Sequence, residues 1–158
     1  MSLDKQIQLL MNDAPQDGIT PKVVAAIAPG LKLLAERLGH LQYYILQSLE
    51  QEWVVTTLRS RDELHHEKRV IYAFPTLKDV VASELEPQLV AIPIPITLIL
   101  FQLIALETVD SIIFFETPGD TTNGIEIRRE DIQRLIQLQL QQSSLSNTPS
   151  NYIPPDIA

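Results

Sequence analysis

The sequence predicts a single α+β domain in which a mixed sheet of five or six strands carries helices on its faces. The apolar period is helical at the N-terminus, changes to the two-residue period of strands in the middle, and then alternates between helix and strand. The chain has 158 residues, 45% of them hydrophobic, which suits one domain with a core. We therefore expect N-terminal helices over 1–39 and a sheet-and-helix core over 40–142, together forming one domain. A polar, proline-containing tail is expected over 143–158.

The N-terminal part of the chain has the pattern of two helices. Residues 3–13 carry apolar side chains at helical spacing, and a second stripe begins at Thr20, a capping residue followed by proline. Pro29 and Gly30 interrupt this stripe, so we expect a kink or a short break there. Gly39 is expected to end the helix in the left-handed conformation.

The middle of the chain predicts an antiparallel meander. Residues 43–49 and 52–58 alternate between apolar and polar and are rich in aromatic and β-branched residues, so we interpret them as a hairpin. Residues 69–74 are the expected third strand, and the charged segment 60–68 holds the turn before it.

Helices and strands alternate after the meander. Thr76 is expected to cap a short helix that ends near residue 83, with Asp79 as the capping-box acid. Residues 89–94 predict a strand that lies at an edge or ends early, because they contain a proline and are followed by another. Thr97 is expected to cap a helix over 98–106 that is apolar nearly all round and therefore central to the core.

The C-terminal part predicts two more strands and a last helix. The continuous apolar run over 109–115 is typical of a strand buried on both faces. A short strand is expected at 125–127 and a helix over about 130–142. The loop 117–124 between the strands has turn residues but no Gly-rich phosphate motif, so nucleotide binding is not supported.

Composition excludes several classes of function. The chain has no cysteine, which excludes disulfides, thiol catalysis and thiolate metal sites. Its formal net charge of -8 repels phosphate backbones, so we expect no nucleic-acid binding. We see no signal peptide and no apolar helix of the ~20 residues that a bilayer requires. We expect a cytoplasmic protein that does not insert into a membrane.

The strongest candidate for a metal site is the pair His65 and His66. It is flanked by Asp62, Glu63 and Glu67, and imidazole with carboxylate is a plausible ligand set for a divalent cation. Adjacent residues rarely point at one ion, so we interpret the pair as part of a solvated loop. We expect no metal, no cofactor and no catalytic residues.

Two basic clusters are interpreted in the same way. The first brackets the histidine loop and is largely neutralised by the acids there, and the second lies near the last helix. The first consists of Arg59, Arg61, Lys68 and Arg69, and the second of Arg128, Arg129 and Arg134.

Aromatic residues are the best candidates for contact with a protein partner. Several of them fall on neighbouring predicted strands, but a slip of one residue moves every side chain to the other face, so core and interface both stay open. These residues are Trp53, Tyr43, Tyr44, Tyr72 and Phe74. The tail 152–156 is short and stiffened by prolines, a form suited to docking in a groove. The chosen contact candidates are Tyr44, Trp53 and Tyr152.

From Trp53 to Leu135 the pattern resembles the SseB-like family, which is named for enhanced serine sensitivity. The resemblance rests on the strand end and helix start at 72–79, the apolar strand and turn at 109–119, and the strand and helix start at 125–132. It covers about half of the chain and does not account for the N-terminal helices. It implies the fold only, because such family members have no established catalytic residues.

Two functions follow from these observations. The first is a non-catalytic protein-interaction domain that acts as an adaptor, assembly factor or regulator, and the missing catalytic motifs favour it. The alternative is a small-ligand sensor or minor enzyme with a pocket between the central helix and the sheet. Gln102, Glu107 and Glu116 are the polar groups expected near that pocket. Homodimerisation is compatible with either function.

Overall fold

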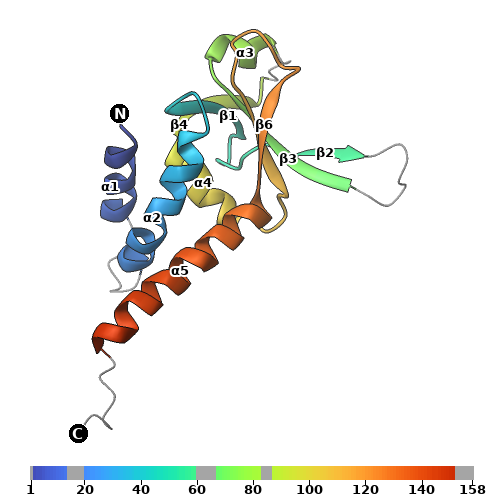
Figure 1. Cartoon of the computed structure of the whole chain (residues 1–158). Coiled ribbons are helices and arrows are strands. Elements are labelled where there is room, and N and C mark those ends of the chain that lie inside the picture. The colour runs from blue at the N-terminus through green and yellow to red at the C-terminus, as the bar shows by residue number, and fades with distance from the viewer. Residues whose placement is uncertain (1, 14–19, 60–66, 83–86, 152–158) are drawn as a thin grey trace, which may run out of the picture.

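The computed structural model describes residues 2–13, 20–59, 67–82 and 87–151 and confirms the α+β class (Figure 1). The helices are α1 (Leu3–Asp13), α2 (Thr20–Glu36), α3 (Leu77–Ala82), α4 (Ile96–Ala105) and α5 (Arg129–Asn151). The strands are β1 (Gln42–Ser48), β2 (Thr56–Arg59), β3 (Glu67–Phe74), β4 (Leu89–Pro95), β5 (Ser111–Phe115) and β6 (Gly124–Arg128). α5 runs past the expected end at Gln142, so 143–151 is helical rather than part of a tail. None of the described helices is long and apolar enough to cross a membrane.

All six strands belong to one mixed sheet. Its order is β4-β1-β3-β5-β6, and β2 pairs with β3 beside this path. Among the paired strands, only β3 and β5 are parallel, because the α3–β4–α4 connection between them returns the chain to the same end of the sheet. β4 lies at an edge, as its prolines predict.

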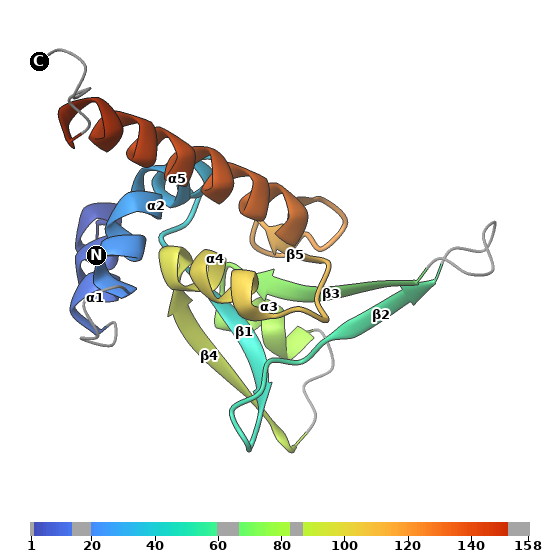
Figure 2. The ribbon, with the colours of Figure 1, turned by 90° about the horizontal axis from the view of Figure 1, so that it is seen from below.

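The expected meander is wrong in its first pair. Facing β1, residues 52–54 form only one isolated bridge, between Gln47 and Trp53, and the chain then moves across to pair with β3 as β2. One edge of β3 therefore has two partners, β2 along 67–70 and β1 along 73–74. Because β3 extends beyond the sheet body, β2 and 67–70 form a two-stranded arm that projects away from the helices (Figures 1 and 2).

One face of the sheet carries α1, α2, α4 and α5, and we call it the covered face (Figure 2). Alternate strand residues point toward these helices and join them in one core. Tyr43, Ile45, Ile71, Ala73, Ile112 and Phe114 form its centre. α4 lies in the middle, as expected, with Ile99, Leu100 and Leu103 fully buried.

The proline–glycine pair does not break α2, contrary to the expected interruption. The helix runs continuously through Pro29 and Gly30. A Cβ atom at Gly30 would lie 3.1 Å from Cγ of Leu135, so this glycine permits the close approach of α5. The expectation for Gly39 is also wrong, because Gly119 is the described glycine with positive φ. α2 ends instead in tight turns, and the Gly39 N–H donates to the Glu116 carboxylate at 3.0 and 3.1 Å.

A distant side chain caps α4, and Thr97 does not. The residue before the helix is Pro95, which makes no side-chain cap. Gln6 of α1 supplies the acceptor: its Oε1 accepts the Thr97 N–H at 3.1 Å and the Thr97 hydroxyl at 2.9 Å. Its Nε2 donates to the Leu41 carbonyl at 2.8 Å. Buried polar groups need such partners, so Gln6 ties α1 to the core.

Candidate functional site

The face of the sheet opposite the core is only partly covered, and it is apolar. We call it the open face, and the short helix α3 packs against it through the fully buried Val80. A sheet face left to solvent normally carries polar residues, whereas apolar side chains cross this one over four strands. They are Tyr44 and Leu46 in β1, Tyr72 and Phe74 in β3, Ala91 in β4, and Ile113 and Phe115 in β5.

A groove of about 430 Å³ crosses the open face, and we call it the aromatic groove. Tyr72 and Phe115 stack there with ring centroids 5.6 Å apart and planes inclined by 13°. Phe74 lies 5.4 Å from Phe115, and both phenylalanines are nearly buried while Tyr72 is half-exposed. The residues that line the groove are Leu46, Val54, Thr56, Tyr72, Phe74, Leu89, Phe115 and Thr121.

Polar contacts between α3 and the β5–β6 loop fix one side of this groove. Thr76 and Asp79 form the expected cap, with the Thr76 hydroxyl donating to Asp79 Oδ2 at 2.7 Å. The other oxygen, Oδ1, accepts the N–H of Gly119 at 2.7 Å, where the backbone φ of +84° suits glycine. Since Thr121 follows in the same loop, its place in the lining is set before any ligand binds.

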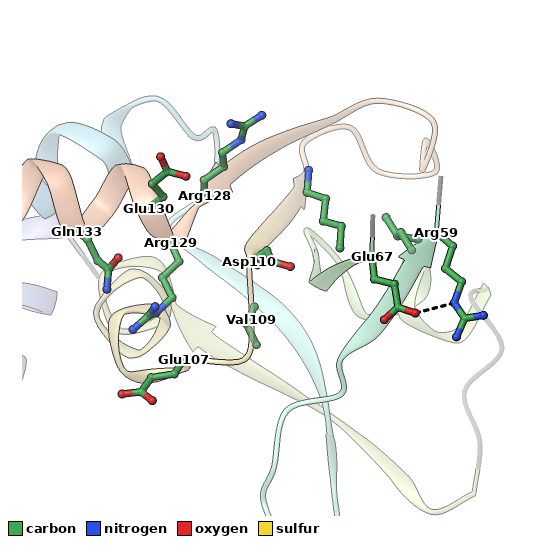
Figure 3. Close-up of a pocket in the computed structure, with 11 residues that line it drawn as sticks. Arg59, Glu67, Glu107, Val109, Asp110, Arg128, Arg129, Glu130 and Gln133 are labelled. Atoms are coloured by element: carbon green, nitrogen blue, oxygen red, sulfur yellow. Dashed lines mark ion pairs between the residues drawn. The ribbon is translucent and has the colours of Figure 1, made fainter. Parts of the chain in front are cut away.

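A second groove, of about 650 Å³, lies between the arm and the start of α5 (Figure 3). We call it the charged groove, because four cationic and four anionic side chains line it together with three uncharged ones. The lining residues are Leu58, Arg59, Glu67, Lys68, Glu107, Val109, Asp110, Arg128, Arg129, Glu130 and Gln133.

Three of the four cations in the charged groove are already bound within the chain. Arg59 Nε lies 3.1 Å from Glu67 Oε1. Arg129 donates from Nε and Nη2 to the Ile104 carbonyl at 3.1 and 2.8 Å, at the C-terminal turn of α4. A cation is favoured there by the unpaired carbonyls and the helix dipole. Arg128 forms no ion pair with a described residue.

Glu126 in β6 binds the third cation, Lys68 of β3. The hydroxyl of the fully buried Ser111 also donates to this carboxylate, at 2.6 Å. Burial by itself would raise the pKa of Glu126, but the bonds from Lys68 and Ser111 and the charges of Lys68 and Arg128 outweigh it and lower the pKa. Three of the four cations of this groove are therefore held by groups of the chain itself, and Arg128 is the one that forms no ion pair with a described residue.

A third polar group joins the end of β5 to the start of β1. The Tyr43 hydroxyl donates to Glu116 Oε2 at 2.7 Å, and His40 Nε2 lies 2.7 Å from the Glu116 carbonyl oxygen. Burial, with the hydrogen bond to the Glu116 carboxylate, raises the pKa of Tyr43 far above its ordinary value. With Gly39 also donating to Glu116, these contacts fasten two chain segments together.

The predicted contact residues lie on different surfaces. Tyr44 is half-buried on the open face, beside the aromatic groove. Trp53 packs against the core of the covered face, on the opposite side of the sheet. Tyr152 lies outside the described residues. The structure therefore places one of the three beside the aromatic groove.

Several other candidates fall outside the described residues or do not converge. His65, His66, Asp62, Glu63 and Arg61 belong to the undescribed segment 60–66. Among the described residues, no group of three histidine or acidic side chains could hold a metal ion.

The space between α4 and the sheet is occupied by core side chains, and both grooves lie elsewhere. The polar groups expected around a pocket there are apart, because Glu107 and Glu116 lie before and after β5. Gln102 is exposed on α4. The three side chains therefore do not face a common cavity.

Comparison of the chain with protein-family models and with curated proteins gave no match. The resemblance to the SseB-like family stays a prediction.

Sequence reasoning did not select most residues of the aromatic groove. Val54, Thr56 and Leu89 were absent from the candidates, Thr121 was considered only as part of the loop 117–124, and Tyr72 and Phe74 were among the aromatic residues considered. The alternation of β3 contains the signal, since Tyr72 and Phe74 share one face and Ile71 and Ala73 share the other. What alternation alone does not say is which of the two faces the helices cover.

Proposed function

We propose that this chain is a non-catalytic protein-interaction domain that binds a partner through the aromatic groove of its open face. It would act as an adaptor, an assembly factor or a regulator, in the cytoplasmic location expected from the sequence. The observation that carries the proposal is the apolar open face, which spans four strands and is only partly covered by α3.

Physical chemistry favours a protein as the ligand. Exposed contiguous apolar surface is unfavourable in water and marks interaction sites in soluble proteins. Aromatic side chains in a preformed depression resemble the buried anchors that dominate binding energy at interfaces. Tyr72 fits this description, because its ring is stacked on Phe115 while the residue as a whole is only half-buried.

Site-specific photocrosslinking in cells that normally produce the protein tests the proposal. A photoreactive phenylalanine analogue would replace Thr56 or Thr121 in the lining of the aromatic groove. Matched controls would carry it at Gln102 or Gln137, which are exposed on α4 and α5. We expect one protein adduct from both groove positions and none from the controls.

A second variant makes the result specific to the groove. Adding Val54→Glu places a charge in the lining, and burying that charge against a partner is costly, so the adduct should decrease at least fivefold. Equal adducts from groove and control positions, or no adduct from either groove position, would contradict the proposed function.

A further inference from the structure

We propose that the occupant of the aromatic groove is an amphipathic α-helix of the partner, with lysine or arginine beside its apolar stripe. This inference rests on the proposed function and names the class of partner. Three features of the groove carry it: the pairing of the strands in its floor, its span across the sheet, and the charge at its rim.

Most backbone groups of the floor strands are paired within the sheet, and the unpaired ones at Ile71 and Tyr72 lie in the plane of the sheet, so a ligand on its face meets side chains. β1 pairs with β4 and β3, β3 with β1, β2 and β5, and β5 with β3 and β6. An extended segment lying on this floor would leave its own N–H and C=O groups without partners, at a cost of several kilocalories per mole. An α-helix satisfies its backbone internally and needs only side-chain contacts from the floor.

The span of the groove also suits a helix. Its lining crosses from Leu89 in β4 to Phe115 in β5, which is three strand spacings or about 14 Å. A helix covers that distance with about ten residues and presents three or four apolar side chains to one side. An extended segment covers it with about four residues, of which two face the floor.

Two acidic residues, Glu52 and Asp120, stand next to lining residues of the groove, and we call this border its rim. Glu52 precedes the lining residue Val54 by two positions, so both side chains lie on the same side of this extended segment. Asp120 adjoins Thr121, and its carboxylate accepts the N–H of Thr122 at 2.8 Å.

Neither Glu52 nor Asp120 forms an ion pair with a cation in the part of the chain that the structure describes. Hydrogen bonds from the hydroxyl and the N–H of Thr122 lower the pKa of Asp120, so it stays ionised near neutral pH. Lys68, on the same face, is paired with Glu126, and the whole chain has a net charge of -8. A helix with basic flanks is complementary to this field.

Three synthetic peptides of 16 residues test the inference. Each has leucine at positions i, i+3, i+4 and i+7; the first has lysine at the flanking positions, the second glutamate at those positions, and the third lysine with a central proline. Binding is measured from the amide NMR shifts of Thr56 and Thr121, with Gln102 as the distant reference. We expect the lysine peptide to bind at least tenfold more tightly than either of the others.

Charge variants of the protein refine the test. Glu52→Gln should weaken the affinity of the protein for the lysine peptide roughly two- to fivefold, which is the usual range for one exposed charge pair. Glu107→Gln is the matched control, because Glu107 lies in the charged groove, and it should leave the affinity unchanged. Raising the salt concentration should also weaken binding of the lysine peptide, because salt screens exposed charges.

The outcomes separate this inference from the proposed function. Equal binding of the proline peptide would overturn the helical occupant, and equal binding of the glutamate peptide would overturn the basic flank. Absence of shifts with all three peptides would overturn the inference as a whole. In each case the crosslinks from Thr56 and Thr121 would still decide whether the aromatic groove binds a partner.

Discussion

The two faces of the sheet are made from alternate residues of the same strands, yet they differ in how far helices cover them. On the covered face, Tyr43, Ile71 and Phe114 are at most 1% exposed beneath four helices. On the open face, Tyr44 and Tyr72 are only half-buried beside one short helix. Both faces are apolar, so hydrophobicity alone does not distinguish them. The two faces differ in the number of helices that pack against them. Because only α3 packs against the open face, part of its apolar surface stays uncovered.

The largest expected effect compares one residue from each face. Phe114→Ala removes a fully buried ring from the covered face and should lower the free energy of unfolding by about 3–5 kcal/mol. Leu46→Ala on the open face should cost about 1–2 kcal/mol, because that side chain is only half-buried. Urea unfolding followed by the fluorescence of the single tryptophan, Trp53, measures both. If both variants lost the same free energy of unfolding, the two faces would contribute equally to stability, contrary to this comparison.

A smaller effect is expected where α1 joins the helical layer. Gln6→Ala leaves the Thr97 amide and hydroxyl without the acceptor that Gln6 supplies, and the Leu41 carbonyl with only the Ile96 N–H, which should cost about 1–3 kcal/mol. Gln8→Ala is the control, since Gln8 is exposed on the same helix, and it should change the stability by less than about 0.5 kcal/mol. The same urea experiment measures both. Similar values for the two variants would mean that α1 does not depend on this contact.

The covered face should also show a specific dependence on alkaline pH. The pKa of Tyr43 is raised in the folded protein, while an unfolded tyrosine ionises near pH 10. Stability from this group is therefore complete below pH 10 and decreases above it, by about 1.4 kcal/mol per pH unit. Unfolding at pH 9 and pH 11 should reveal this loss in the wild type and not in Tyr43→Phe. The same loss in both proteins would assign it to other groups.

The smallest effect on stability is expected within the aromatic groove. Thr121 is exposed, so Thr121→Glu should change the free energy of unfolding by less than about 0.5 kcal/mol. The charge would nevertheless face an apolar ligand, and the crosslinked adduct from position 56 should decrease at least fivefold. A variant that loses stability in proportion to binding would indicate that the open face belongs to the core after all.

Local sequence patterns predicted most elements of the fold but not the contacts that connect them. Periodicity and capping residues placed the helices and strands, including the Thr76–Asp79 cap. The predicted β1–β2 hairpin failed because β1 pairs with β3 only at residues 73 and 74 and leaves the same edge of β3 open at 67–70 for residues 56–59. Thr97 failed as a cap because Gln6, 91 positions away in the chain, makes that contact. Such long-range partners leave no local pattern.

The candidate site was predictable only in part for a related reason. Alternation separates Tyr72 and Phe74 from Ile71 and Ala73, but the amphipathic stripes of α2 and α5 do not say which set they will meet. The aromatic groove also depends on Thr121, which comes from a loop placed by the contact between Asp79 and Gly119. Trp53 was selected for its type, and its bridge to Gln47 turns it to the core instead.

The shared edge of β3 has a mechanical consequence. β1 pairs with Ala73 and Phe74 and β2 with residues 67–70, so Ile71 and Tyr72 have no ladder partner on that edge among the described strands. The arm therefore meets the body of the sheet at a seam on the β1 side only, because the pairing of residues 70–73 with β5 runs across it. Tilting of the arm would bend the β3–β5 pairing without breaking a bond to β1. Tyr72 stands at the seam and Thr56 begins the arm, so such tilting would widen or narrow the space above the rings. Hydrogen exchange at these amides would detect that hinge.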